Sequence, residues 1–336
     1  KLRLLLEPFL PRGKDRENES VAGFFRRRLG QEALDYAANP FVAGVYAARP
    51  ETLILRHAFP TIHELEGEHR SLMLGGMKTA KHRKREGLPK TRLVSFREGL
   101  AELPHRLAEE LGDALRLNAP VRKISRQGEE WLVTFEEEGE VAEERAERLV
   151  CALPAHKLTD LEWENLGEAE SISTLASAPH HPVAVLHHGF RREEVGHALD
   201  GFGFLVPEKE NLQILGTLFS STLFPGRAPE GHVLLTTFVG GERQPDLAQL
   251  EDDALHDLAL KDLRALLDLR ADPVFRNVVR WPQAIPLPDS GQDDRLAAAE
   301  RLQAANPGLC LTGSHLTGVS IPACLDGAES MTLSHG

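Results

Sequence analysis

Near its C-terminus the chain reads Gly308-Leu309-Cys310-Leu311-Thr312-Gly313-Ser314-His315-Leu316-Thr317-Gly318-Val319-Ser320-Ile321-Pro322-Ala323. The apolar run Leu309 to Leu311 predicts a short buried strand, and Gly313 and Gly318 mark points where the backbone turns or approaches another group closely. A helix-like pattern begins after Gly318. Backbone N–H groups at a helix start are unpaired and carry partial positive charge, so this corner suits a phosphate or the electron-rich edge of a flat ring. On the glycines alone, an ordinary strand-to-helix corner explains the stretch equally well.

The composition is that of a globular protein with room for two domains, because 41% of its 336 residues are hydrophobic and 27% are charged. Asp and Glu outnumber Lys and Arg by 51 to 39, a net charge of −12 that argues against nucleic acid as the main partner. No apolar run reaches the roughly 18 residues of a membrane span. Cys151, Cys310 and Cys324 lie in apolar segments without metal-ligand spacing, which predicts buried free thiols in a reducing compartment.

The first 92 residues read as helices. Ser20 is placed to cap one helix and Gly30 to end it, and Gln31 to Ala38 continues as a second. The basic run Lys78 to Arg85 stands out in an acidic protein. It predicts a solvated loop. The alternative is contact with an anionic lipid surface or with the carboxylates of a ligand.

Strands and helices mix from about residue 93 onwards. A helix leading to Gly112 is followed by the strand pattern Leu115 to Ile124, its hairpin partner Trp131 to Phe135, and a buried strand within 148–154. Between residues 158 and 280, four strands with glycine or proline punctuation precede an amphipathic helix, Glu251 to Leu269. This pattern predicts a mixed or antiparallel sheet with a helix packed on it.

Several longer phrases resemble one known family. They are Pro40-Phe41-Val42-Ala43-Gly44-Val45-Tyr46-Ala47, Gly201-Phe202-Gly203-Phe204-Leu205-Val206-Pro207, Val239-Gly240-Gly241, Trp281-Pro282-Gln283-Ala284-Ile285-Pro286 and the C-terminal glycine stretch. Together they resemble the oxygen-dependent protoporphyrinogen and coproporphyrinogen oxidases, a branch of the flavin amine oxidases. The resemblance implies an FAD-dependent enzyme of haem biosynthesis that oxidises a porphyrinogen to the porphyrin and reduces O2 to hydrogen peroxide.

The resemblance also implies site residues. Those implied to bind FAD are Val121, through its main chain, and Trp281, Gly313, Gly318, Val319, Ser320 and Ile321. Those implied to line the tetrapyrrole cavity are Gly44, Phe202, Leu205 and Phe238. From spacing alone, Gly44 could equally be a close packing point of a helix, and Phe202, Leu205 and Phe238 could equally be core residues of a sheet. No catalytic acid or base is predicted, and His180, His181, His187, His188 and His315 lack the spacing of a metal site.

The expected fold is an incomplete FAD-binding domain of the α/β type with an α+β substrate domain and a helical lobe. We expect the lobe at residues 1–92, on the membrane or substrate side, the substrate domain at 158–280, and the two parts of the FAD-binding domain at 93–157 and 281–336. The sequence contains no G-x-G-x-x-G, the fingerprint that holds a dinucleotide, and begins with Lys1. These features predict a nucleotide-binding unit upstream of this sequence.

Two alternatives remain at this point. One is a non-catalytic relative that keeps only the tetrapyrrole cavity. The other is an amine oxidase or desaturase relative, which the phrase Gly201 to Pro207 argues against. A cytoplasmic location fits, peripheral membrane contact and a homodimer stay open, and the substrate is either protoporphyrinogen IX or coproporphyrinogen III.

Overall fold

The computed structural model describes residues 6–87 and 94–333, with the backbone alone for residues 332 and 333. The expectations at Lys1 and at residue 93 lie outside the described residues. The chain divides into two compact units, Lys1–Ser95 with His180–Ile285, and Phe96–Pro179 with Pro286–Gly336. Each unit is therefore built from two separate stretches of sequence.

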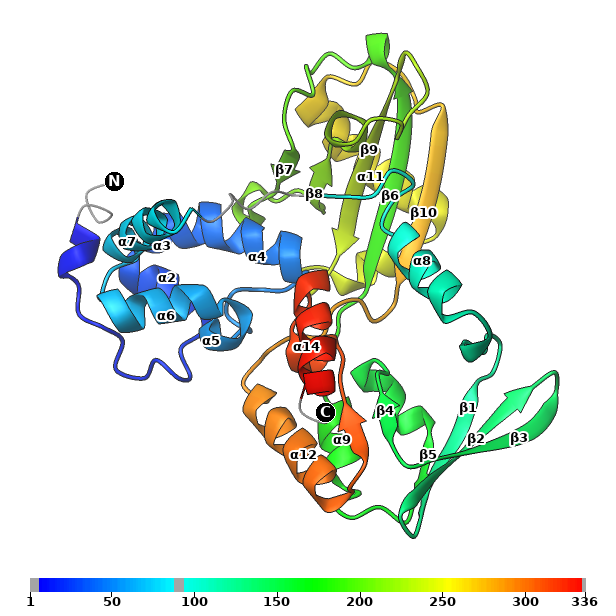
Figure 1. Cartoon of the computed structure of the whole chain (residues 1–336). Helices are drawn as coiled ribbons and strands as arrows, with labels where there is room; N and C mark the ends of the chain where they lie inside the picture. Colours follow the sequence, from blue (N-terminus) through cyan, green and yellow to red (C-terminus); the bar gives the residue numbers. More distant parts are fainter. Residues whose placement is uncertain (1–5, 88–93, 334–336) are drawn as a thin grey trace. The chain divides into compact units, whose positions relative to one another are not determined.

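Short helices form the N-terminal part of the first unit (Figure 1). They are η1 Glu7–Phe9, α2 Val21–Arg28, α3 Gln31–Ala33, the π-helix η2 Leu34–Ala38, α4 Asn39–Tyr46, α5 Leu55–Ala58, α6 Pro60–His69 and α7 Leu72–Arg85. Side-chain caps begin two of them: Ser20 Oγ accepts from Gly23 N–H, and Ser71 Oγ accepts from Leu74 N–H. Pro40 and Pro60 stand in the first turns of α4 and α6, where a missing N–H costs nothing.

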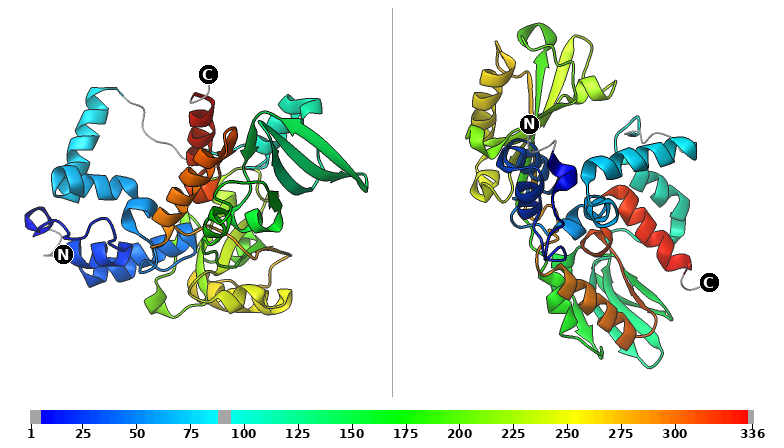
Figure 2. Two further views of the ribbon diagram at one scale, coloured as in Figure 1. Left: turned by 90° about the horizontal axis from the view of Figure 1, so that it is seen from below. Right: turned by 90° about the vertical axis from the view of Figure 1, so that its left-hand side faces the viewer.

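A five-stranded antiparallel sheet forms the rest of the first unit. Its order is β10-β6-β9-β8-β7, and the bounds are β6 Val183–Arg191, β7 Gly203–Leu205, β8 Ile214–Leu218, β9 His232–Gly240 and β10 Phe275–Trp281. Helix α11 (Asp252–Leu267) covers one face of this sheet (Figures 1 and 2). Alternate residues of β6, Ala184, Leu186 and Phe190, are fully buried against it. Short helices link the strands: η5 Arg192–Glu194, η6 Glu208–Glu210, α10 Ser220–Leu223 and η7 Pro245–Gln249.

Helix α4 lies against β7 and β8 of the same unit. Ala43 and Ala47 pack on Val183 and Leu215 of the sheet. Glu242, which follows β9, links the sheet to the segment after α4. Its N–H donates to Ala47 O at 2.7 Å, and its carboxylate accepts from the N–H of Arg49 and the hydroxyl of Thr52. The sheet face opposite α11 is therefore held next to α4.

The second unit contains two smaller sheets. The first has the order β3-β2-β1-β5, with β1 Val121–Gln127, β2 Glu130–Glu137, β3 Glu140–Ala146 and β5 Glu162–Glu164. The second is a parallel pair, β4 Leu149–Cys151 with β11 Leu309–Leu311. The helices are α8 Glu102–Leu111, η3 Gly112–Ala114, η4 Ala155–Asp160, α9 Ser171–Ala176, α12 Gln292–Ala305, α13 Ser314–Thr317 and α14 Ile321–Leu333.

A buried core joins the two sequence stretches of the second unit. Helix α9 packs on α12 (Figure 1). Trp131, Leu175 and Leu302 are completely buried in the core of this unit. By contrast, α8 leaves Leu107 and Leu111 more than half exposed.

Most predicted elements are present, with three differences. Residues 78–85 are the exposed end of helix α7 and not a loop. Strand β1 begins only at Val121, because Asn118 adopts a left-handed conformation with φ of 56° and Pro120 donates no hydrogen bond. Residues 158–179 belong to the second unit, since β5 pairs with β1 and α9 packs on α12, whereas we expected them in the substrate domain. Among the described residues, no helix is both long and apolar enough to cross a bilayer.

Candidate active site

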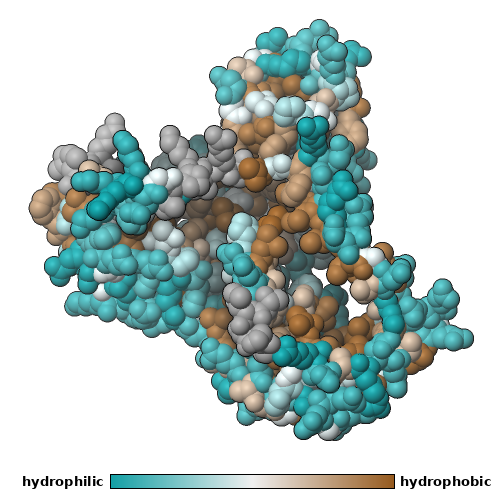
Figure 3. Space-filling model, viewed as in Figure 1, coloured by the Kyte–Doolittle hydropathy of each residue, from teal (hydrophilic) through white to brown (hydrophobic). Residues whose placement is uncertain are grey.

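The first unit contains an apolar cavity of about 320 Å3 between helix α4 and the sheet. Its walls are Ala43, Gly44, Ala47, Val183, Val185, Leu215, Phe238, Trp281, Ala284 and Ile285. In Figure 3, hydrophobic residues gather around the ends of β6 and β9 where this cavity lies. Cavities with aromatic and branched aliphatic walls bind flat apolar ligands well.

Three of the residues implied by the resemblance meet in this cavity: Gly44, Phe238 and Trp281. Leu205 lies directly on Gly44, because a Cβ built at Gly44 would come within 2.5 Å of Leu205 Cδ2. Gly44 therefore leaves room for the Leu205 side chain, which is 42% exposed. Phe202 is 52% exposed and is not among the described residues that line the cavity.

The sequence reasoning missed the aliphatic walls of this cavity, notably Val183 and Val185. Their signal is the alternation along β6, where Val183, Val185 and His187 face away from α11 while Ala184 and Leu186 face it. Reading strand faces and not only family phrases would have found them.

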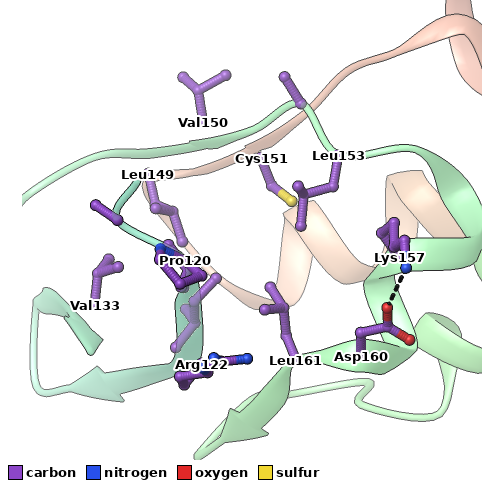
Figure 4. A pocket seen from close by; sticks show the side chains of 14 residues that line it. Pro120, Arg122, Val133, Leu149, Val150, Cys151, Leu153, Lys157, Asp160 and Leu161 are labelled. Carbon is purple, nitrogen blue, oxygen red and sulfur yellow. Dashed lines mark hydrogen bonds and ion pairs between the residues drawn. The ribbon is translucent and has the colours of Figure 1, made fainter. Parts of the chain in front are cut away.

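The second unit has its own cavity of about 610 Å3 (Figure 4). Apolar side chains from β1, β4 and the segment after β4 line most of it, including Val121, Leu149, Cys151 and Leu153. Its charged residues are Arg122, Lys157 and Asp160, of which Lys157 and Asp160 form an ion pair at 2.7 Å. Burial raises the pKa of the Cys151 thiol, so this cysteine is a neutral wall and not a nucleophile.

The glycine stretch adjoins this cavity at the carboxyl ends of the parallel strands. Thr312 N–H donates to Cys151 O at 3.0 Å, and a Cβ at Gly313 would lie 3.6 Å from the carbonyl oxygen of Leu153. Gly313 and Gly318 have φ of 135° and 112°, which favours glycine at both positions. In parallel sheets, ligands bind outside the carboxyl ends of the strands.

Val319, Ser320 and Ile321 connect this turn to helix α14. Ser320 Oγ accepts from Ala323 N–H at 3.2 Å, and Ile321, the first residue of α14, is 44% exposed. None of the three is among the described residues that line the 610 Å3 cavity. Trp281 belongs to the first unit, so the residues implied to bind FAD are divided between the two units.

The structure places the candidate histidines mostly in and beside strand β6. His188 is completely buried, and its Nε2 lies 2.9 Å from His256 Nδ1, whereas His187 is half-buried on the cavity face. His315 is buried within α13, and His180 and His181 precede β6. In the described ranges, no group of three or more His, Cys, Asp or Glu side chains could hold a metal ion. None of the three cysteines forms a disulfide. Cys151 is buried, while Cys310 and Cys324 are half-buried.

The family follows from a comparison of the whole chain. It belongs to the flavin-containing amine oxidoreductases, whose family model matches residues 1–330. The predicted fold class and the predicted class of enzyme, a flavin oxidoreductase, are thereby confirmed.

Within that family, the chain is similar to porphyrinogen oxidases. It is 33% identical to the mitochondrial protoporphyrinogen oxidase of Nicotiana tabacum, over 97% of this chain and 70% of the relative. It is 28% identical to the coproporphyrinogen III oxidase of Bacillus subtilis, over 97% of this chain and 69% of the relative. A crystal structure from Exiguobacterium sp. 255-15, provisionally named protoporphyrinogen oxidase, matches 99% of this chain with a TM-score of 0.77 at 23% identity, and 71% of that structure is covered. The resemblance read from the sequence phrases is confirmed.

Proposed function

We propose that this chain belongs to an FAD-dependent enzyme that oxidises protoporphyrinogen IX or coproporphyrinogen III to the porphyrin in haem biosynthesis, with O2 as the electron acceptor. The names of the relatives support this reaction. The observation that carries the proposal is the apolar cavity of the first unit, because Gly44 and Phe238, which the resemblance assigns to the tetrapyrrole, share it with Trp281.

The substrate's macrocycle suits this cavity for a physical reason. Four linked pyrroles present broad apolar surfaces, and Phe238 and Val185 offer matching aromatic and aliphatic walls. Gly44 and Leu205 adjoin this wall, and Phe202 at the edge of the sheet is exposed enough to contact a ligand that extends beyond it. The first unit would therefore bind and orient the substrate and exclude water from its reacting face.

The second unit fits FAD at its flavin ring and, through the main chain of Val121, at its adenine. Gly313 and Gly318 hold the backbone open after β11, and Val121 presents main-chain groups beside the cavity at the strand ends. We assign Val319, Ser320 and Ile321 to the flavin ring and Trp281 to its edge. When bound, FAD accepts the electrons that the substrate loses. These residues would place the ring and leave the redox chemistry to the cofactor.

The relatives named above are longer than the part that this chain matches, since about 30% of each is unmatched. The two strands β4 and β11 form a parallel pair of three residues each, and parallel sheets are normally larger and covered on both faces.

The test uses two ligands. The protein is mixed with FAD and passed through a gel-filtration column, and retained flavin absorbance is measured. Porphyrin fluorescence quenching is measured separately. Quenching with flavin retention supports the oxidase, and quenching alone would support a non-catalytic tetrapyrrole-binding protein. Absence of both contradicts the proposal for this chain.

Replacing Phe238 by alanine is expected to weaken porphyrin binding about 10-fold, because a stacked aromatic wall is lost at about 1–1.5 kcal/mol. The measurement is a fluorescence titration with protoporphyrin IX. Phe9→Ala is the control, since Phe9 is 83% exposed and distant in sequence from every cavity residue. Equal porphyrin affinities of the two variants would show that Phe238 is not part of the binding site.

A second proposal concerns helix α7, which we assign to peripheral contact with an anionic membrane surface. Met73, Leu74 and Met77 are 42%, 46% and 68% exposed, although apolar. Gly75 is buried against Leu65 and His69 of α6, so the apolar residues point away from this packing face. One turn later the exposed face continues with Lys78, Lys81, Lys84 and Arg85.

The positive charges along helix α7 repel one another. Lys78, Lys81 and Lys84 are spaced by three residues on an exposed helix, and no acidic residue occurs within Leu72–Arg85. An anionic surface would relieve the repulsion, and the apolar side chains would enter the headgroup boundary. These features support a cytoplasmic protein that docks on the membrane periphery.

The triple variant Lys78→Gln/Lys81→Gln/Lys84→Gln is expected to lose about 100-fold in affinity for phosphatidylglycerol vesicles, at about 1 kcal/mol for each cation. Sedimentation with vesicles measures the bound fraction. The matched control, Arg116→Gln/Arg122→Gln/Arg145→Gln, removes the same charge from exposed positions of the second unit. Equal losses in both variants would indicate unspecific attraction and refute a role for α7.

A further inference from the structure

On the cavity face of the five-stranded sheet, a row of polar side chains lies next to the apolar cavity wall. His187 of β6 lies directly opposite Asn277 of β10 and Thr236 of β9. The neighbouring row consists of Val185, Val279 and Phe238, which is apolar. Because opposite residues of antiparallel strands share a face, the polar row borders the cavity wall formed by Val185 and Phe238.

The hydrogen bonds within this row define its chemistry. Asn277 Nδ2 lies 3.2 Å from His187 Nδ1, and Thr236 Oγ1 lies 2.7 Å from Ser220 Oγ. When the Asn277 amide donates to Nδ1, the proton of the neutral imidazole is on Nε2. Within the described residues, Nε2 of His187 has no hydrogen-bond partner. The row therefore presents an oriented N–H donor beside an apolar wall.

The His187 ring offers this N–H donor as a neutral group. Burial lowers the pKa of His187, so the ring is neutral at pH 7. A neutral N–H donor at the edge of an apolar site binds an anionic oxygen without burying a second charge, and it therefore fixes orientation more than it adds attraction. A carboxylate side chain of a ligand lying over Val185 and Phe238 would reach this row, because the two rows are adjacent along β6 and β9.

We propose that His187, oriented by Asn277, binds a carboxylate of the tetrapyrrole and so sets which edge of the macrocycle enters the cavity. This inference rests on the proposed substrate class. His187 would be a specificity residue, and Asn277 a positioning residue that acts through it. Neither residue was assigned by the resemblance to the porphyrinogen oxidases.

The test combines variants with two forms of the ligand. The affinities of wild type, His187→Phe and His187→Gln are measured by fluorescence quenching with coproporphyrin III and with its tetramethyl ester. We expect His187→Phe to weaken binding of the free acid about 10-fold, as the loss of a hydrogen bond to a charged group does. Binding of the ester should change less than 2-fold. His187→Gln keeps an N–H donor and should retain most of the affinity.

His232 provides the matched control for His187. His232 lies on the same sheet face two rows further along β9, and His232→Phe should leave both affinities unchanged. An equal loss for acid and ester would show that His187 acts through packing and would overturn the inference. Unchanged binding in His187→Phe would overturn it as well. If wild type quenches neither ligand, the proposed substrate class itself fails.

Discussion

Replacing Glu66 by glutamine is expected to lower the free energy of unfolding by about 3–5 kcal/mol, the usual result of breaking a buried ion pair on one side. Glu66 and Arg28 are both completely buried, and Arg28 Nε lies 2.7 Å from Glu66 Oε1. Arg27 and Arg16 also reach the Glu66 carboxylate, at 2.8 and 3.3 Å. The neutral amide would leave these guanidinium groups without their shared counter-charge. Urea titration of both proteins measures the difference.

Glu68→Gln provides the control on the same helix, because the Glu68 side chain is 73% exposed and its pairing with His69 is a surface contact at 3.6 Å. Its effect should stay within about 0.5 kcal/mol. Similar costs for both substitutions would contradict a stabilising role of the buried cluster.

The same cluster has a pH signature. Burial by itself would raise the pKa of Glu66, but hydrogen bonds from Arg27 and Arg28 outweigh burial and lower it. The contribution of Glu66 to stability is therefore complete above its unfolded pKa of about 4.5 and is lost as the pH falls through the lower folded value. Glu66→Gln should remove this part of the acid sensitivity.

The ion cluster illustrates what the sequence did not reveal. Glu7, Arg28 and Glu66 come from three segments spread over about 60 residues, and Arg26-Arg27-Arg28 looks like a surface run at the end of a helix. In the fold Arg28 is completely buried and donates to the carbonyl oxygens of Glu7, Leu10 and Arg70. Local patterns carry no signal of such contacts, because the partners are distant in sequence.

Strands and caps were predictable because their causes are local. Ser20 caps α2 as expected, and the pattern Leu309 to Leu311 forms β11. The basic run was expected as a loop because charge dominates its composition, yet Ser71 caps a helix that continues through Lys84 and Arg85. Family phrases indicated Gly44 and Phe238 as site residues, but the polar row at His187 required the strand register.

His188 is expected to make the protein less stable as the pH falls from about 6.5 to 5, by about 2 kcal/mol at pH 5. Burial between β6 and α11, with smaller contributions from His256 and Arg276, lowers its pKa to about 3. Below the unfolded pKa of 6.5 the unfolded chain binds a proton that the folded chain excludes, so stability decreases with decreasing pH. Burial also lowers the pKa of the neighbouring His256, although Asp252, Asp253 and Asp257 of α11 oppose this shift.

The measurement is the urea midpoint between pH 7.5 and 5 for wild type and for the double variant His188→Leu/His256→Leu. The double variant removes both ends of the 2.9 Å contact, so no buried nitrogen loses its partner, and its midpoint should vary less with pH. His232→Leu, at a half-buried position on the same sheet, should keep the wild-type dependence. A double variant as acid-sensitive as wild type would assign the loss to other groups. Because His188 faces α11 while His187 faces the cavity, this stability effect should be separable from porphyrin binding at neutral pH.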